Sequence, residues 1–417
     1  MQILMLSSTF PYPPSRGGTE IRTFNLLQYL QQRHEVILLT QRPPQVEDGE
    51  VAALRQAVSE LHLFPLPADP PRGRGLRSLA SKAARFSHAL RKATPPNVLH
   101  RYSPALQAWV DAAVQAGRVQ AITCEHSVNE IYVRPEFRQR LKTVVNVHSS
   151  LYGWVSNHLA MGASPQPLRD RLYLNLLLAR YETRYCAKFT DIVVTTEDDR
   201  RQLCQFDPGA TLHVIPNGVD LALFPYRDRD PGGYNLVFVG DMSASHNIDA
   251  ARFFALEVLP QVQARYPEAT FTIVGGRPTA AIQALGDRPG ITVTGRVPST
   301  TAYLHAAAVA VVPLRTGFGI KNKTLEAMAA GVPVVASDRG LEGLAVDEPG
   351  QPLRALRAND IEAYVTAIGR LFETPTLRAT LAAAGRALIE AEYTWEQAGA
   401  RYEAVLTTRL EADDPTQ

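Results

Sequence analysis

The chain has 417 residues, which exceeds the size at which one hydrophobic core usually divides, so two or three domains are expected. Hydrophobic residues make up 45% of the sequence and charged residues 20%, which excludes a disordered, collagen-like or coiled-coil protein. The 43 basic and 41 acidic side chains give a net charge of +2, which is too balanced for a dedicated nucleic-acid-binding protein, and no nucleic-acid partner is expected.

The N-terminal segment and the cysteines favour a cytoplasmic protein. Residues 1–8 have no basic segment before their apolar run, and the run is too short for a signal peptide or a membrane span. Cys124, Cys186 and Cys204 lie far apart and form no Cys-x-x-Cys pair, so neither a disulfide framework nor a zinc site is expected.

The first half alternates between apolar runs of strand length and helical stretches, the order typical of a doubly wound α/β domain. Residues 2–6 predict a buried strand, residues 20–32 predict a helix with apolar positions at helical spacing, and residues 35–40 predict a second strand. Further strands are expected at residues 61–66, 98–100, 120–124, 143–148 and 191–195.

The second half repeats this pattern after the segment Ile-Pro-Asn-Gly-Val-Asp at 215–220 and a turn-rich stretch at 225–233. Its strands are expected at residues 234–240, 270–276, 291–295, 309–313 and 332–336. A final helix is expected at 395–410, before a polar tail at 411–417. The predicted organisation is therefore a first domain at 1–210, a linker at 211–233, a second domain at 234–392, and a helix that crosses back, with the tail, at 393–417.

The strongest chemical signal lies in residues 313–337, where a strand ends, a Gly-x-Gly loop follows and a helix starts near Asn322. Glycines let backbone N–H groups approach an anion, and a helix N-terminus adds partial positive charge. The loop supplies two glycines and three cations: Gly317, Gly319, Arg315, Lys321 and Lys323. This combination favours a diphosphate site over the alternative, a flexible turn with solvated cations.

Two further residues are candidates for contacts with a sugar. Glu326 lies one turn into the helix, where a carboxylate can accept two hydrogen bonds from a ribose diol, although a surface or capping glutamate is the alternative. His148 ends a predicted strand, where an imidazole can donate a hydrogen bond to a donor sugar or orient an acceptor; the alternative is a histidine satisfied within a loop.

Residues 313–337 resemble the nucleotide-sugar site of the retaining family-4 glycosyltransferases, and Leu-Glu-Ala-Met-Ala-x-Gly-x-Pro-Val-Val is the most specific part. The Pro-x-x-Gly-Gly-x-Glu turn, the His-Glu-Val strand, Ile-Pro-Asn-Gly-Val-Asp and Trp395 extend the resemblance over nearly the whole chain. It implies the GT-B fold, in which two Rossmann-like doubly wound α/β domains face each other across a cleft. It also implies a nucleoside-diphosphate sugar donor and no other cofactor.

The resemblance assigns roles to particular residues. Glu326 would hold the ribose, and the backbone N–H groups of Thr324 and Leu325 would bind the diphosphate. Gly295, Arg296 and Val297 would flank the base. Gly17 and Gly18 would approach the diphosphate and the acceptor, and a histidine at the position of His148 is common in the family.

The chain departs from the family in two places. The first glutamate of the usual Glu-x7-Glu pair is missing, because Phe318 or, with a gap, Thr316 stands there. The family's usual Arg and Lys after the Val-Gly strand align with Asp241 and His246. We therefore expect Arg315, Lys321 and Lys323 to neutralise the phosphates, with Arg315, Lys321 and His148 in the catalytic roles.

Three alternatives remain for the function. A nucleotide-sugar epimerase would use a related scaffold, and a catalytically weak family member would bind nucleotide-sugar without turnover. An NAD-dependent oxidoreductase is disfavoured, because neither half has Gly-x-Gly-x-x-Gly directly after its first strand. The acidic runs at 197–199 and 228–230 are expected to be surface charge, and no metal is expected. A glycan, a lipid-linked molecule or a small molecule could each be the acceptor.

Residues 72–92 contain seven cations and no acid, with apolar residues at helical intervals. The cations are Arg72, Arg74, Arg77, Lys82, Arg85, Arg91 and Lys92. Such a helix can lie on an anionic bilayer or guide an anionic lipid-linked acceptor, which would make the protein peripheral at the inner face of the membrane. A solvated face packed by its apolar side is the alternative.

Overall fold

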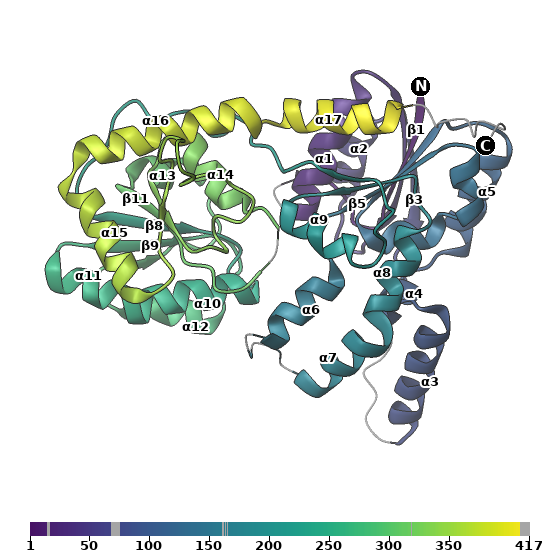
Figure 1. The fold of residues 1–417 in the computed structure, drawn as a ribbon, viewed down its shortest axis with the longest axis horizontal. Helices are drawn as coiled ribbons and strands as arrows, with labels where there is room; N and C mark the ends of the chain where they lie inside the picture. Colours follow the sequence, from purple (N-terminus) through teal and green to yellow (C-terminus); the bar gives the residue numbers. More distant parts are fainter. Residues whose placement is uncertain are drawn as a thin grey trace. The chain divides into compact units, whose positions relative to one another are not determined.

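The computed structural model describes residues 1–14, 17–67, 76–160, 162, 164, 166–317 and 319–408, with the side chains of 76–80 and 82 excepted. Residues 72–75 of the expected basic helix, Phe318 and the tail at 411–417 lie outside this part of the chain. The chain divides into two compact units, Met1–Ile215 with Ala398–Gln417 (unit 1) and Pro216–Gln397 (unit 2). In each unit helices cover both faces of a parallel sheet (Figure 1). The expected α/β class is confirmed.

The described part of unit 1 holds a seven-stranded sheet in the order β3-β2-β1-β4-β5-β6-β7. Its strands are β1 (Gln2–Ser7), β2 (Glu35–Arg42), β3 (Glu60–Pro65), β4 (Ala121–Glu125), β5 (Lys142–Val147), β6 (Asp191–Val194) and β7 (Leu212–Val214). All pairs are parallel, with Ile3 opposite Val36 on one side and Ala121 on the other. The strand order reverses between β1 and β4, so the crossover connections diverge there and leave room for a site at the carboxyl ends of these strands.

Helices fill the connections of unit 1. They are α1 (Gly18–Gln31), α2 (Asp48–Gln56), α3 (Leu76–Lys92), α4 (Pro96–His100), α5 (Pro104–Gln115), α6 (Leu151–Ala160), α7 (Pro167–Tyr173), α8 (Ala179–Cys186) and α9 (Glu197–Cys204), with the π-helical turn η4 (Leu174–Leu178) between α7 and α8. Residues 98–100, expected as a strand, belong to α4. Pro96 starts this helix, because its missing N–H needs no partner in the first turn and its φ is already helical.

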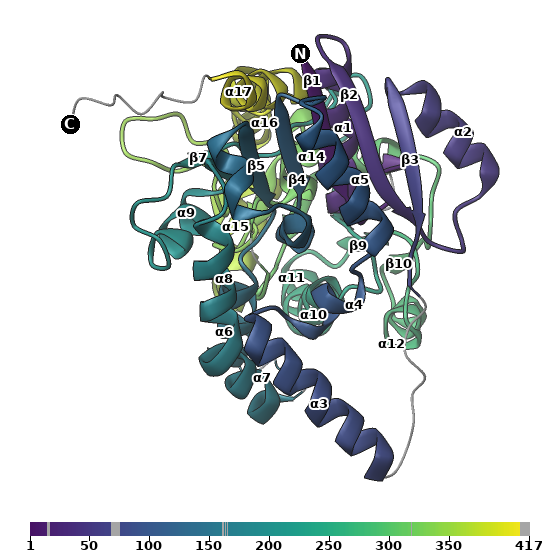
Figure 2. The same ribbon diagram turned by 90° about the vertical axis from the view of Figure 1, so that its right-hand side faces the viewer.

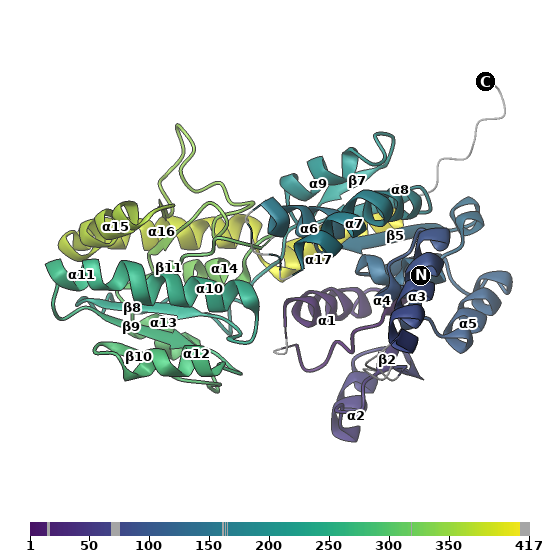
Figure 3. The same ribbon diagram turned by 90° about the horizontal axis from the view of Figure 1, so that it is seen from below.

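The described part of unit 2 holds a six-stranded parallel sheet in the order β10-β9-β8-β11-β12-β13. Its strands are β8 (Asn235–Val239), β9 (Thr270–Val274), β10 (Ile291–Val293), β11 (Val309–Val312), β12 (Val334–Ala336) and β13 (Leu356–Arg357). Its helices are α10 (Ser245–Phe253), α11 (Leu259–Arg265), α12 (Ala280–Gln283), α13 (Thr301–Ala306), α14 (Asn322–Ala329), α15 (Ile361–Glu373) and α16 (Pro375–Glu392). Helices α10 and α11 lie on one face of this sheet and α13 on the other (Figures 1 and 3). The order reverses between β8 and β11, beside the start of α14.

The stretch at 225–233 belongs to unit 2, although the sequence favoured a linker there. Its Arg227 side chain is buried and donates to the Ala307 carbonyl oxygen at 2.8 Å. Asp230 accepts from Arg378 at 2.7 Å. Because these bonds tie both residues to the unit 2 core, the chain changes units earlier, between Ile215 and Pro216.

The Ile-Pro-Asn-Gly-Val-Asp segment has a packing role in unit 2. A Cβ on Gly218 would lie 2.3 Å from the backbone nitrogen of Trp395, so no larger residue fits without a shift of the chain. The N–H of Val219 donates to the Tyr393 carbonyl oxygen at 2.8 Å. The glycine is therefore explained by close backbone approach.

Helix α17 (Trp395–Thr407) begins in unit 2 and, from Ala398 on, packs within unit 1. A Cβ on Gly399 would lie 2.2 Å from the Tyr29 ring, so the glycine lets the helix lie against α1. Glu403 accepts hydrogen bonds from Tyr29 at 3.1 Å and pairs with His34 at 2.8 Å. The closing helix is thus fixed to the first helix of the chain.

Candidate functional site

The N-terminus of α14 in unit 2 follows β11, at the carboxyl edge of the sheet beside the switch point. The N–H groups of Thr324 and Leu325 donate to the Lys321 carbonyl oxygen at 2.9 and 3.3 Å, so both are already used within the helix. The N–H groups of Asn322 and Lys323 donate to no acceptor among the described residues. Among the described residues, the N–H groups without an acceptor at this helix start are therefore those of Asn322 and Lys323, and not those of Thr324 and Leu325, where anion contacts were expected.

The loop before α14 requires glycine at two positions. Gly317 has φ +110° and Gly319 has φ +76°, in the region that side chains disfavour. The loop ends at Lys321, which is the N-cap of α14. The side chain of Asn322 is held at 2.8 Å by Asn217 of the Ile-Pro-Asn-Gly-Val-Asp segment.

Two of the three loop cations are neutralised by carboxylates. The Arg315 guanidinium donates to Asp249 of α10, with Nε 2.9 Å from Oδ2, and lies 4.8 Å from the centre of the Phe253 ring. The Lys321 ammonium is buried and lies 3.1 Å from a carboxylate oxygen of Glu342. These two cations, expected to neutralise phosphates, are thus engaged in protein ion pairs.

Lys323 has a different environment. Its ammonium donates to the neutral amide oxygen of Asn247 and lies 4.6 Å from the centre of the Phe238 ring. Burial lowers the pKa of Lys323 to about 7, against the attraction of the Glu326 carboxylate. A Cβ on Gly240, at the end of β8, would lie 2.8 Å from this ammonium, so the Val-Gly strand end makes room for it. Lys323 is therefore the loop cation best able to exchange its neutral partner for an anion.

The Glu326 carboxylate makes no hydrogen bond or ion pair within the described part of the chain, although the residue is half-buried. Burial raises its pKa to about 7, and the nearby Lys323 ammonium opposes this rise. A half-buried carboxylate without a partner has both oxygens available as acceptors. This arrangement suits a ligand with two adjacent hydroxyl groups.

The residues expected to flank the base follow β10, at the same carboxyl edge of the unit 2 sheet as the start of α14 but three strands away from β11. Gly295, with φ +67°, follows β10 and accepts a hydrogen bond from the N–H of Gly275 at 3.2 Å. Arg296 is exposed and Val297 is half-buried against the unit 2 core. Strands β9 and β8 separate them from β11, which corresponds to roughly 14 Å at the usual strand spacing.

In unit 1, His148 follows β5 and takes part in a buried polar network. Its Nε2 lies 3.9 Å from Oε2 of Glu125, the last residue of β4, and has no hydrogen-bond partner among the described residues. Glu125 accepts from Tyr402 of α17 at 2.8 Å and from Asn146 at 2.9 Å. Arg22 of α1, which is fully buried, donates to Asn146 at 3.0 Å.

The charges of this network are fixed by its hydrogen bonds. Burial alone would raise the pKa of Glu125, but His148, Tyr402 and Arg22 together hold it below its ordinary value. Burial lowers the pKa of His148. The imidazole is therefore held neutral, beside an ionised carboxylate, with one ring nitrogen unsatisfied.

His126 is a neighbour that the sequence analysis missed. It follows β4 with φ +77°, a strained conformation for a histidine, and its ring lies 5.3 Å from the ring of His148. Burial lowers its pKa to about 3. The available signal was that His126, like His148, comes directly after a strand, and the two strands are neighbours in the sheet.

The remaining predicted site residues lie at the start of α1. Gly17 is the N-cap and has extended backbone, and a Cβ there would lie 2.8 Å from the Glu20 carboxylate. A Cβ on Gly18 would meet nothing within 4 Å. Open space at Gly18 leaves the helix N-terminus accessible.

The acidic runs have structural partners. Glu197 pairs with Arg200. Thr196 caps α9: its hydroxyl accepts from the N–H of Asp199 and donates to the Asp199 carboxylate. Asp230 holds Arg378. In the described residues no group of three or more His, Cys, Asp or Glu side chains is placed to hold a metal ion.

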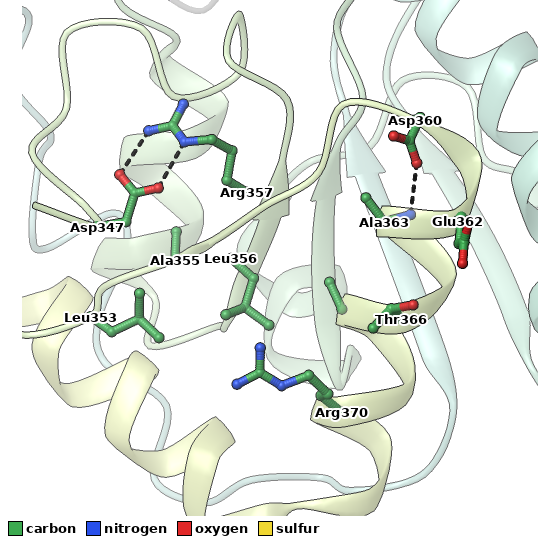
Figure 4. Close-up of a pocket in the computed structure, with 11 residues that line it drawn as sticks. Asp347, Leu353, Ala355, Leu356, Arg357, Asp360, Glu362, Ala363, Thr366 and Arg370 are labelled. Atoms are coloured by element: carbon green, nitrogen blue, oxygen red, sulfur yellow. Dashed lines mark hydrogen bonds and ion pairs between the residues drawn. The ribbon is translucent and has the colours of Figure 1, made fainter.

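A surface hollow of about 510 Å³ lies along β13 and α15 in unit 2 (Figure 4). Its Arg357 is bound to Asp347 at 2.7 and 2.8 Å, and Asp360 caps α15 by accepting from the N–H of Ala363. None of the predicted site residues lines it. The hollow is therefore separate from the residues that were predicted to form the donor site.

Sequence comparison identifies relatives of both units. Residues 16–223 match the profile of glycosyltransferase family 4, and residues 233–374 match that of glycosyl transferases group 1. A GDP-mannose-dependent alpha-(1-6)-phosphatidylinositol monomannoside mannosyltransferase of Mycolicibacterium smegmatis is 25% identical over a 412-residue alignment that covers 90% of this chain and 99% of the relative. A GDP-mannose-dependent monoacylated alpha-(1-6)-phosphatidylinositol monomannoside mannosyltransferase of Corynebacterium glutamicum is 32% identical over 166 residues, 36% of this chain and 42% of the relative.

Solved structures share the whole fold at low sequence identity. HepE of Anabaena, in complex with UDP, superposes with a TM-score of 0.66 at 15% identity and covers 98% of this chain and 100% of its own. TarM of S. aureus, in a complex that includes UDP, gives 0.65 at 12% identity with the same coverage. The profiles divide the chain between its two units and these structures match its α/β architecture throughout, so the chain belongs to the GT-B glycosyltransferases of family 4.

Proposed function

We propose that this glycosyltransferase moves a sugar from a nucleoside-diphosphate donor to a hydroxyl group of a glycan, lipid-linked or small-molecule acceptor, with retention of the anomeric configuration and without a metal. The observation that carries the proposal is the pair at the start of α14. The Glu326 carboxylate has no partner in the described chain, and the Lys323 ammonium beside it has only a neutral one. A ribose diol and a diphosphate would satisfy both.

The diphosphate contact follows from the local electrostatics. A buried ammonium without a carboxylate partner destabilises the folded chain. A phosphate oxygen beside it would stabilise the protonated form of Lys323. The N–H groups of Asn322 and Lys323 and the positive end of the α14 dipole add to this attraction. Arg315 and Lys321 would act at longer range, because their ion pairs already neutralise them.

The reaction breaks the bond between the anomeric carbon and the diphosphate oxygen and forms a bond from that carbon to the acceptor oxygen on the same face. The acceptor proton passes to the leaving diphosphate. The chain's part is to stabilise the charge that develops on the diphosphate, through Lys323 and the helix N-terminus, and to orient the reactants. The neutral His148, whose Nε2 has no hydrogen-bond partner among the described residues, would donate a hydrogen bond to a donor-sugar hydroxyl.

The experiment uses a panel of donors with the full chain. Two relatives are named as GDP-mannose-dependent, and HepE was solved with UDP-glucose, so the panel begins with GDP-mannose and UDP-glucose. A donor that raises the melting temperature binds the folded chain. Release of nucleoside diphosphate only when an acceptor is present supports transfer, and the anomeric configuration of the product, read by NMR, tests retention.

A second candidate, binding of nucleotide-sugar without turnover, is favoured by the missing first glutamate of the Glu-x7-Glu pair. It predicts a thermal shift with a donor and no nucleotide release with any acceptor. Formation of an isomerised donor without acceptor would instead indicate an epimerase. Absence of binding by every nucleoside diphosphate would contradict the proposal itself.

A further inference from the structure

An apolar stripe lies exposed on the helical part of unit 1. Leu168, Leu172 and Leu176 follow one another at intervals of four along α7 and η4, with 82%, 47% and 43% of their surface exposed. Residues four apart share one side of a helix, so the three leucines form a continuous strip. Trp154 of the neighbouring helix α6 is also exposed. Large apolar side chains gathered in this way mark an interaction surface rather than scattered exposure.

Arginines border the strip on both sides. At 3.6 residues per turn, Arg171 lies on one side of Leu168 and Leu172, and Arg169 lies on the other. Arg180 follows the π-helical turn, near the start of α8. Arg171 and Arg180 are exposed and form no ion pair among the described residues. We call these residues the leucine–arginine face: Trp154, Leu168, Arg169, Arg171, Leu172, Leu176 and Arg180.

The surroundings of this face contain almost no negative charge. Asp170 is the sole acid between residues 151 and 180, and its side chain is buried and bonded to Ser164 and Arg169. The basic helix α3 packs alongside, with the Phe86 ring 5.0 Å from the Tyr173 ring. Helices α3, α6 and α7 project together from the sheet of unit 1 (Figures 1 and 2).

The structure changes the role expected for residues 72–92. In the described part of α3, Phe86 and Leu90 are half-buried and Ala89 is fully buried, so its apolar side faces the domain. Its exposed cations include Arg85, Arg91 and Lys92. The apolar contact surface is therefore on α7 and η4, and α3 contributes charge beside it.

We propose that the leucine–arginine face docks unit 1 onto the surface of an anionic lipid bilayer. Leucine side chains enter the boundary between headgroups and acyl chains, and arginines beside them reach the lipid phosphates. In the described chain no helix is long and apolar enough to cross a membrane, so the contact is interfacial. A symmetric dimer through this face would bury Arg171 and Arg180 with no exposed carboxylate from residues 151–180 to pair with them, which disfavours a second copy.

The proposal is independent of the donor site and is tested without substrates. The full chain is sedimented with equimolar phosphatidylcholine–phosphatidylglycerol vesicles and with pure phosphatidylcholine vesicles. Wild type should bind the anionic vesicles, and the binding should weaken with added salt. The L168S/L172S/L176S variant should lose about 30-fold or more in partition coefficient, and R171Q/R180Q about fivefold for each arginine.

The matched control is Leu223→Ser, which removes a comparably exposed leucine from unit 2 and should leave vesicle binding unchanged. The changed side chains are exposed, so melting temperatures should stay close to wild type, and the arginine variant provides a second test if the leucine variant does not fold. Equal binding by wild type and both variants, or no binding to anionic vesicles, would overturn the proposal. A wild-type dimer in solution that the leucine variant abolishes would also overturn it and assign the face to a second copy.

Discussion

Replacing Lys323 by methionine removes the ammonium that we assign to the diphosphate and keeps a side chain of similar length. A hydrogen bond to a charged group contributes about 1.5–3 kcal/mol, so a loss of about 2 kcal/mol corresponds to roughly 30-fold weaker binding of a nucleoside diphosphate. Arg315→Met is the matched control. Its guanidinium is already paired with Asp249, so its removal should weaken binding by less than about threefold.

The same substitution should stabilise the ligand-free chain. The folded-state pKa of Lys323 is lowered to about 7 by burial, so the unfolded state binds more protons between about pH 7 and the ordinary lysine pKa. Wild-type stability therefore rises with pH through this window, and the buried ammonium costs stability at and below pH 7. The stability of Lys323→Met should not rise with pH in this window, and its melting temperature at pH 7 should equal or exceed that of wild type.

Isothermal titration calorimetry with GDP and UDP, together with melting curves from pH 6 to 10, measures both effects. A weaker affinity combined with an unchanged or higher melting temperature supports the assignment, because a folding defect would lower both. Unchanged affinity in Lys323→Met, or an equal loss in Arg315→Met, would refute the reasoning.

Three further predictions follow from the same structure. Nucleotide affinity should peak near pH 7 and fall about tenfold per pH unit on either side, because Lys323, with a pKa of about 7, loses its proton above that pH, and Glu326, with a pKa of about 7, gains one below it. Calorimetric affinities measured across pH test this, and an affinity that does not change with pH would contradict it. Lys321→Met should lower the free energy of unfolding by about 2 kcal/mol, because it leaves the buried Glu342 carboxylate with only the more distant cation of Arg339, at 3.6 Å. Urea unfolding measures this, and unchanged stability would contradict it. Gly218→Ala should lower the free energy of unfolding by about 1–3 kcal/mol in urea, because the alanine Cβ would overlap the backbone at the start of α17. Unchanged stability would show that the close backbone approach at Gly218 is not required.

Much of the architecture could be predicted from periodicity alone. Strands β1 and β5 are buried on both faces, so most of their residues are apolar and such runs are easy to recognise in the sequence. Strands β7 and β13 have only three and two residues, and their sequences carry too little pattern to separate them from loops. The strand predicted at 98–100 was wrong for the same reason, because a short apolar stretch fits one turn of a helix as well as a strand.

The candidate site could be located, but its internal partners could not. Glycines, cations and a helix start within residues 313–326 are local in sequence, so the anion-binding loop was recognisable. The groups that neutralise the cations, Asp249 and Glu342, and the amide of Asn247 come from distant segments that only the fold brings near. For that reason the sequence favoured Arg315 and Lys321 for the catalytic roles, whereas the structure singles out Lys323.

The unit 1 network illustrates the same limit. His148 was visible as a strand end, but its buried neighbours were not: Glu125 lies 3.9 Å from its Nε2 and accepts a hydrogen bond from Tyr402 of the last helix. A hydrogen bond that spans 277 positions leaves no local pattern. The strained backbone at His126 is likewise set by tertiary packing, which no propensity reports.

The central claim is that Glu326 holds the ribose diol of a nucleoside diphosphate, and one comparison tests it directly. Calorimetric affinities are measured for wild type and Glu326→Gln with GDP or UDP, whichever binds, and with its 2′,3′-dideoxy analogue. We predict that wild type binds the dideoxy analogue about tenfold or more weakly, and that Glu326→Gln discriminates far less between the two ligands. Equal affinity of wild type for both ligands would contradict the account.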